Sequence, residues 1–174
     1  MEQKNIARPD TNEYAPYYQT YISKVNTDDL IGALKNGEKE LVQLMQSLSE
    51  EKLNYRYAEG KWTIKEIIIH LMDVERVFTC RALRFSRNDK TPLPGFDEDE
   101  YRPASNASQR SLQSLLDEYH ALRRSTIEFY RNVTPEMSLR TGIANGKEIS
   151  VRALGFIIPG HEGHHLGVIK ERYL

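Results

Sequence analysis

The sequence has little of several things that would point to particular classes of protein. Among its 174 residues there is a single cysteine, Cys80, so an internal disulfide is excluded. It has no run of about eighteen apolar residues, and its first residues lack the apolar core of a signal peptide. The formal net charge of −1 argues against a broad basic surface. We therefore expect a cytoplasmic protein that binds neither nucleic acid nor membranes.

Several motifs of known chemistry are also missing. The sequence contains no glycine-rich phosphate loop and no Ser-His-Asp motif. The acidic run Asp97–Glu100 lacks the ligand spacing and central glycine of a calcium loop, so we expect it to be solvated. Cys80 follows His70 by ten residues on one predicted helix, about 15 Å away. That distance is too great for a shared site, and we expect a buried, inert thiol.

Four stretches carry apolar residues at helical spacing. Apolar side chains recur every three or four positions in each, as in helices that bury one face. The clearest start is a capping box formed by Thr63 and Glu66, with Trp62 and Ile67 in the flanking hydrophobic positions. The pattern predicts an all-α protein, large enough for one domain with a sizeable core. The helices are expected near residues 28–46, 63–87, 108–132 and 150–173.

The segments outside these helices are expected to differ in character. Residues 1–26 form a tyrosine-rich arm that should lie along a bundle domain of residues 27–174, since tyrosines favour packing over disorder. Residues 88–106 should form one long crossover connection, which helical bundles tolerate. Asn145-Gly146 favours a small type I′ hairpin, whose strands would be residues 141–144 and 147–150.

Histidines near the end of the chain are the strongest functional signal. His161, His164 and His165 lie within five positions, and imidazoles one helical turn apart can share a metal ion. Both His161/His164 and His161/His165 have suitable spacing. The stripe through His161 and His165 is apolar and faces a core, whereas the stripe through His164 is small and polar. We therefore select His161 and His165, with His164 as a flanking residue.

Two histidines hold a metal poorly, so a third ligand is expected. His70 lies among apolar residues, where a buried imidazole needs a partner. His120 shares its face with Gln113, Asp117 and Arg124, which indicates a solvated face. A core histidine bonded to a carbonyl is the alternative for His70, but the pair at His161 favours a three-histidine site.

Other polar residues could support this site. Glu66, Asp73 and Glu162 are candidates for orienting the free ring nitrogens, with surface ion pairs as the alternative for each. Arg81 and Arg84, together with the 88–106 connection, could bind the charged groups of a cofactor, although solvated arginines are more common. Imidazole ligands suit zinc, nickel, copper or iron, and three of them leave a coordination position open for catalysis.

Four stretches of the sequence form a specific combination: Gly60–His70, Arg81–Phe85, Thr91–Phe96 and Gly160–Leu166. Taken together, they resemble the DinB/YfiT-like family, and the resemblance runs from about residue 28 to 174. The arm at residues 14–18 also looks like that of close relatives, whereas Pro159 departs from the small or apolar residue usual at its position.

The resemblance implies a fold, a metal and an assembly. It implies a four-helix bundle in which His70, His161 and His165 bind a divalent metal, often nickel or zinc. It also implies that the protein pairs as a homodimer, since bundles of this family often do.

The reaction is more open than the fold. Characterised relatives include enzymes that use low-molecular-weight thiols, so the resemblance slightly favours thiol-dependent S-transfer to a small electrophile. The alternatives are a metal-dependent hydrolase and a non-enzymatic metal-containing binding or stress-response module. Glu162 follows His161 as in the metalloprotease motif His-Glu-x-x-His. Protease activity nevertheless ranks low, because the third ligand lies on a distant helix and no sheet edge is expected to hold a peptide.

Overall fold

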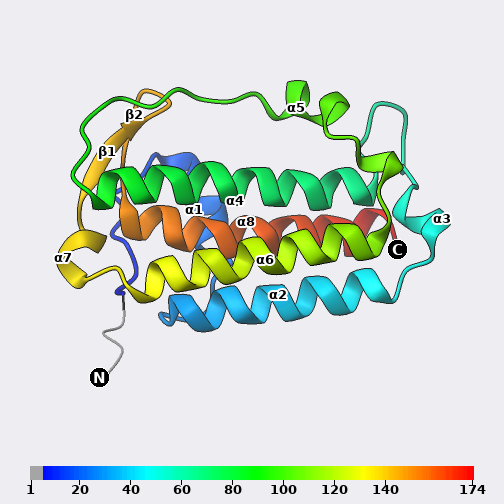
Figure 1. Ribbon diagram of the computed structural model, residues 1–174, viewed down its shortest axis with the longest axis horizontal. Helices are drawn as coiled ribbons and strands as arrows, with labels where there is room; N and C mark the ends of the chain where they lie inside the picture. The colour runs from blue at the N-terminus through cyan, green and yellow to red at the C-terminus, as the bar shows by residue number, and fades with distance from the viewer. Residues whose placement is uncertain (1–5) are drawn as a thin grey trace.

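Four long helices lie side by side and form the body of the protein (Figure 1). The computed structural model describes residues 6–174. The all-α four-helix bundle expected from the sequence is confirmed, and the helix ends fall within a few residues of the predicted ones. The helices are α2 (Leu30–Gln46), α4 (Ile64–Ser86), α6 (Leu112–Arg131) and α8 (Val151–Arg172).

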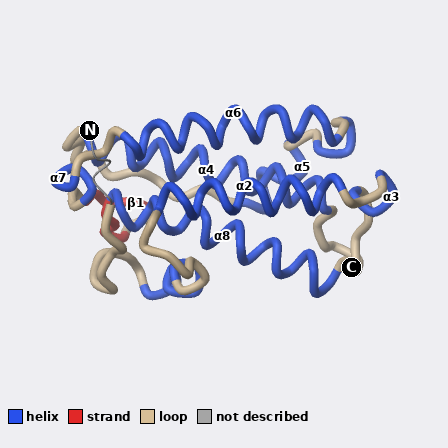
Figure 2. Tube along the Cα trace, turned by 90° about the horizontal axis from the view of Figure 1, so that it is seen from below, coloured by secondary structure: helices blue, strands red, loops and turns tan. Residues whose placement is uncertain are grey.

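Short elements connect or flank the long helices (Figure 2). The predicted hairpin is present: β1 and β2 pair antiparallel, and both turn residues, Asn145 and Gly146, have positive φ. The short elements are η1 (Pro16–Tyr18), α1 (Gln19–Ile22), α3 (Glu50–Leu53), α5 (Glu98–Ala104), η2 (Ala107–Gln109), α7 (Pro135–Ser138), β1 (Thr141–Ala144) and β2 (Lys147–Ser150).

The long connection between α4 and α6 contains regular structure of its own. The acidic run Asp97–Glu100 is exposed, as expected, and Asp97 also caps α5 by accepting hydrogen bonds from the backbone N–H groups of Asp99 and Glu100. Carboxylates in a first turn are stabilised by the helix dipole, which explains why this run starts a helix. Before α5, Leu93 pairs with the hairpin through backbone bonds to Ile143 and Asn145. Leu93 therefore anchors the connection to the hairpin.

Helix α4 begins as the sequence predicts. The Thr63 hydroxyl accepts from the Glu66 backbone at 3.1 Å, and the Thr63 backbone donates to the Glu66 carboxylate at 2.6 Å. This capping box fixes the first turn of α4 and so the position of His70 in the second. Cys80 corrects a prediction: it is exposed, because it shares the outer stripe of α4 with Arg76 rather than the buried one.

Helix α8 is largely buried and receives the described part of the arm. Residues along almost every side of its first half are buried, and it runs through Pro159 without interruption. Gly160 allows a close approach, since a Cβ there would lie 2.2 Å from the carbonyl oxygen of Tyr21. The arm therefore packs directly onto α8 beside His161. Residues 1–5 of the predicted arm lie outside the described residues, and a separate arm domain stays a prediction.

Two hydrophobic clusters fill the bundle, one toward each end of the long helices. In the part of the chain that the structure describes, every helix is too short or too polar to cross a membrane.

Candidate metal centre

Two helices bring three imidazoles together inside the bundle. His70 comes from the second turn of α4, and His161 and His165 come from one face of α8, one turn apart. The Nε2 atom of His161 lies 3.1 Å from the Nε2 atom of His70 and 3.1 Å from that of His165. One ring nitrogen from each residue lies within 4.8 Å of the others. The structure thus groups the three histidines that the sequence analysis selected.

This arrangement fits a divalent cation better than a hydrogen-bonded cluster. Imidazole nitrogens bind zinc at about 2.0–2.1 Å, so two ligands at 90–110° lie about 2.9–3.4 Å apart. The observed separations fall in this range. The single Nε2 of a neutral His161 can make only one good hydrogen bond, either as donor or as acceptor. Two neighbours at 3.1 Å therefore leave one contact unsatisfied unless a cation lies between the rings.

Burial keeps these imidazoles in the form that binds metals. His70 and His161 are each 6% exposed. Burial lowers the pKa of His70 to about 4, and burial and the neighbouring histidines lower the pKa of His165 to about 3. The pKa of His161 also falls well below its ordinary value, for the same reasons. At neutral pH all three rings are uncharged, so their lone pairs are available.

Aromatic rings hold the imidazoles from two sides. Trp62 lies edge-on to His70, with 4.8 Å between ring centroids, and Tyr21 of the arm lies edge-on to His161 at 5.1 Å. His164 lies beside the group, with its ring 5.2 Å from that of His165, as a flanking residue would. The arm thus supplies one wall of the site.

Glu66 and Asp73 lie beside His70 but are engaged elsewhere. Both line a small pocket next to His70. The Glu66 carboxylate accepts from the backbone of Thr63 and from the guanidinium of Arg56 at 3.1 Å. Asp73 lies 3.9 Å from Arg76, and burial raises its pKa. Neither has a hydrogen bond to a ring nitrogen of the three histidines within residues 6–174, so the orienting role expected for them is not seen.

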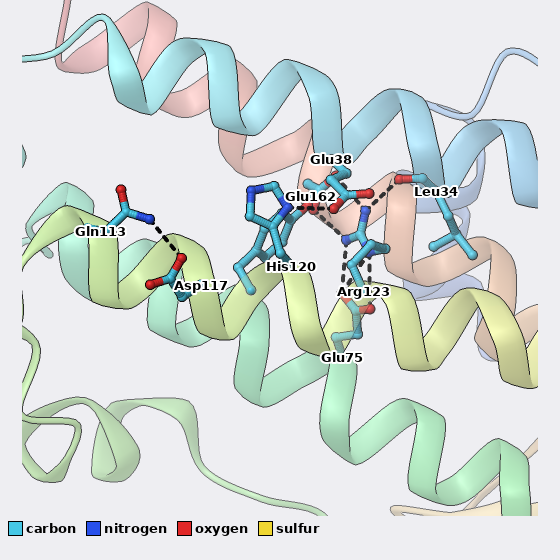
Figure 3. A network of polar contacts seen from close by, with 9 residues as sticks. Leu34, Glu38, Glu75, Gln113, Asp117, His120, Arg123 and Glu162 are labelled. Atoms are coloured by element: carbon cyan, nitrogen blue, oxygen red, sulfur yellow. Dashed lines mark hydrogen bonds and ion pairs between the residues drawn. The ribbon is translucent and has the colours of Figure 1, made fainter.

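Glu162 corrects the sequence analysis more clearly. Its carboxylate accepts a hydrogen bond from Arg123 (Figure 3) and another from the Tyr119 hydroxyl, each at 2.6 Å. Successive residues on a helix differ by about 100° in direction, so Glu162 cannot share the face of His161. The alternative of a surface ion pair is also wrong, because Glu162 is 1% exposed. The missed signal was Arg123, which lies on the apolar stripe of α6.

Glu98 is the site residue that the sequence analysis did not find. It lies in the first turn of α5, and its Oε2 atom is 3.8 Å from the Nε2 atom of His70. Burial raises the pKa of this carboxyl, and Asp99 and Asp97 raise it further. The available signal was Asp97 as a capping residue just before it. Nothing local to the sequence indicates that α5 folds back over α4.

Of the three histidines, His161 lines a cavity of about 130 Å³ between the arm, α4, α8 and the connection. Arg81 lines this cavity, whereas Arg84 instead pairs with Asp89 at 2.7 Å. Of the two predicted cation candidates, one therefore faces the cavity. The remaining side chains on its wall are mainly aromatic. The aromatic and titratable residues on this wall are Tyr17, Tyr18, Tyr21, Phe78, Phe96, Glu98 and His161.

His120 lies outside the group, as expected. Its Nδ1 atom is 2.7 Å from Glu38, and half of its side chain is exposed (Figure 3). In the same view Gln113 donates to Asp117 at 2.7 Å on the outer face of α6. The prediction of a solvated face is confirmed.

Comparison with known proteins gives a consistent result. The family described as the DinB superfamily matches residues 33–169. A Bacillus subtilis protein named "Putative metal-dependent hydrolase YfiT" is 27% identical over 98% of this chain and 96% of its own length. A protein of Oceanobacillus iheyensis with the same description is 27% identical over 84% of this chain and 87% of its own length.

A solved structure agrees on the fold. The structure of Bacillus subtilis YfiT, described as having an unusual four-helix bundle topology, matches with a TM-score of 0.71. The match covers 94% of this chain and 90% of that one at 16% identity, so it speaks to the fold alone.

Proposed function

The chain belongs to the DinB superfamily, and from that premise we propose that it is a metal-dependent hydrolase of a small molecule. His70, His161 and His165 would hold a divalent cation, zinc or nickel, through their ring nitrogens. Imidazole ligands suit both metals. When bound, such a cation with an open coordination position acidifies water and so supplies a nucleophile at neutral pH.

The position of Glu98 beside His70 is the observation that favours hydrolysis. Water must lose a proton as it attacks, and a carboxylate within reach can accept that proton. Glu98 Oε2, 3.8 Å from His70 Nε2, is the carboxylate oxygen closest to the three imidazoles in the ion pairs of residues 6–174. Its raised pKa moves it toward the neutral range in which a general base works best. Glu98 then returns the proton to the leaving group.

The alternatives lack a comparable observation. Thiol transfer, which the family resemblance slightly favoured, needs no carboxylate base, because a thiol bound at a metal is already deprotonated. The similar proteins named above are described as metal-dependent hydrolases. A non-enzymatic binding module would not need a carboxylate beside the histidines.

The test uses protein purified without a histidine tag, stripped by a chelator and reconstituted with zinc or nickel. Hydrolysis of a panel of small 4-nitrophenyl esters and amides is followed by nitrophenol or nitroaniline release. His161→Ala should lose both metal and turnover. Glu98→Gln should keep its metal content but lower kcat about 10²–10⁴-fold, the usual contribution of a general base.

Glu100→Gln is the matched control, because Glu100 is an exposed carboxylate on the same helix, α5, and its loss should leave kcat unchanged. Equal turnover by Glu98→Gln and the parent would remove Glu98 from the mechanism. Turnover that appears only with a low-molecular-weight thiol such as cysteine or glutathione would replace hydrolysis with transfer. Metal binding without any turnover would favour the binding module.

A further inference from the structure

Arg81 is a buried cation without a carboxylate partner among residues 6–174. It lies on the same stripe of α4 as His70 and Val74, and it is 4% exposed. Its one protein acceptor in the described chain is the carbonyl of Pro94, which receives a hydrogen bond from Nη2 at 2.8 Å. The guanidinium lies 5.4 Å from the centroid of the Phe78 ring and 5.9 Å from that of Phe96. Two aromatic rings therefore hold it in place without neutralising it.

The two other buried arginines in residues 6–174, Arg123 and Arg152, both pair with carboxylates. Arg123 donates to the carboxylates of Glu75 and Glu162. Arg152 donates to Glu13 and lies 3.2 Å from Asp10. A buried charge is normally retained only with a partner of opposite sign, because its desolvation is costly. Arg81 departs from this rule, and burial lowers its pKa accordingly.

The donors that Pro94 does not use are accessible. Within residues 6–174, no fully buried side-chain nitrogen or oxygen lacks a hydrogen-bond partner. The free N–H groups of Arg81 therefore face open space. Arg81 lines the cavity that reaches His161, and it also lines an outer groove of about 380 Å³ between α4 and the connection. It thus stands where a ligand entering from the groove would meet the cavity.

We propose that Arg81 binds the carboxylate of a small aromatic or apolar substrate whose other end reaches the three histidines. This inference rests on the proposed function and names the substrate class of the same site. A guanidinium matches a carboxylate through two parallel hydrogen bonds. Tyr18, Phe78 and Phe96 offer the apolar walls between that end and His161.

A carboxylate suits the cavity better than a phosphate does. A phosphate dianion would need several donors or cations, and among residues 6–174 Arg81 is the one lysine or arginine lining this cavity. The cavity also contains the carboxylate of Glu98, which would repel a dianion more strongly than a monoanion. A singly charged substrate end therefore fits the charges that the cavity presents.

The test measures binding to the metal-free full-length protein, so that a carboxylate cannot bind through the metal. The probes are 3-phenylpropionate and its neutral analogue 3-phenylpropionamide, titrated by ligand-observed NMR. The parent should bind the carboxylate at least about tenfold more tightly than the amide, as a charge-assisted bidentate pair implies. Arg81→Gln should lose this preference. Arg84→Gln, which removes an arginine already paired with Asp89, should keep it.

Each failure has its own meaning. Equal affinity of the parent for the two probes, or an unchanged preference in Arg81→Gln, would overturn the inference even if the protein hydrolyses esters. A carboxylate preference that depends on Arg81 would stand even if no hydrolysis were found. If Arg81→Gln does not fold, Arg81→Lys keeps the charge without the planar fork. It should weaken carboxylate binding at least about threefold, and unchanged affinity would count against the role of Arg81.

Discussion

His161 has one Nε2 atom and two imidazole neighbours at 3.1 Å. This mismatch favours a shared cation over a chain of hydrogen bonds, because a neutral ring nitrogen either donates once or accepts once. His164 has no such position. It lies on the neighbouring side of α8, against Tyr21 and the edge of His165. We therefore expect His164 and His165, although adjacent in sequence, to contribute differently to metal affinity.

His165→Ala should weaken metal binding by more than about 100-fold, since even residues that only orient a ligand are worth 10–100-fold. His164→Ala should weaken it less than about tenfold. Metal content and affinity of tag-free protein, measured by elemental analysis and by competition with a chelator, compare the two variants. The reverse order of effects would make His164 the partner of His161.

At the scale of elements, the described part of the arm is fastened to the start of α8. Arg152 in the first turn of α8 donates to the Glu13 carboxylate. Burial alone would raise the pKa of Glu13, but hydrogen bonds from Arg152 and Ser150 outweigh it and lower the pKa. The arm carries Tyr21 and so forms one wall of the metal centre. This ion pair is therefore expected to influence the site as well as the stability.

The contribution of Glu13 should depend on pH in a defined direction. A carboxyl whose folded pKa lies below its unfolded value of 4.5 stabilises fully above pH 4.5, and the effect disappears as pH falls through the lowered pKa. Glu13→Gln should lower the free energy of unfolding by about 1 kcal/mol at pH 7. The difference from the parent should shrink below pH 4.5. Urea unfolding at several pH values checks this, and a constant difference would contradict it.

For the whole molecule, one guanidinium joins the four long helices. Arg123 of α6 donates to Glu75 of α4, to Glu162 of α8 and to the carbonyl of Leu34 in α2 (Figure 3). Arg123 is 1% exposed. Burial opposes its charge, but the carboxylates of Glu162 and Glu75 raise its pKa well above the ordinary value. The cluster therefore acts as a polar crosslink at the centre of the bundle.

Arg123→Ala should destabilise the protein by about 3–5 kcal/mol, because it leaves two buried carboxylates without their counter-charge. Lys170→Ala is the control, since Lys170 pairs with Glu40 on the surface and both side chains are half-exposed. It should cost less than about 1 kcal/mol. Urea unfolding followed by circular dichroism measures both. A loss within 1 kcal/mol of the control would show that the cluster is not a crosslink.

The homodimer implied by family resemblance stays a prediction at this same scale. Light scattering over a range of protein concentrations would test it, and a monomer at high concentration would refute it.

The sequence by itself determined the local features of this protein. The capping box at Thr63, the Asn145-Gly146 turn and the apolar stripes each depend on residues a few positions apart, so they could be predicted together with the helices. The histidine spacing on α8 is local in the same sense. His70 could be paired with it because a buried imidazole needs a partner wherever that partner lies.

Tertiary structure decided what depends on contacts between distant segments. Glu98 reaches His70 because α5 folds back over α4, and no periodicity within residues 88–106 encodes that path. Glu162 pairs with Arg123 rather than with a histidine, and Cys80 is exposed rather than buried. Both differ from the prediction because the packing of neighbouring helices selects which stripe of each helix is buried. Arg81 became an uncompensated cation in a cavity only when the connection brought Pro94 and Phe96 against α4. Local spacing fixes the direction of a side chain from its own helix, whereas its partners are set by the assembly of the bundle.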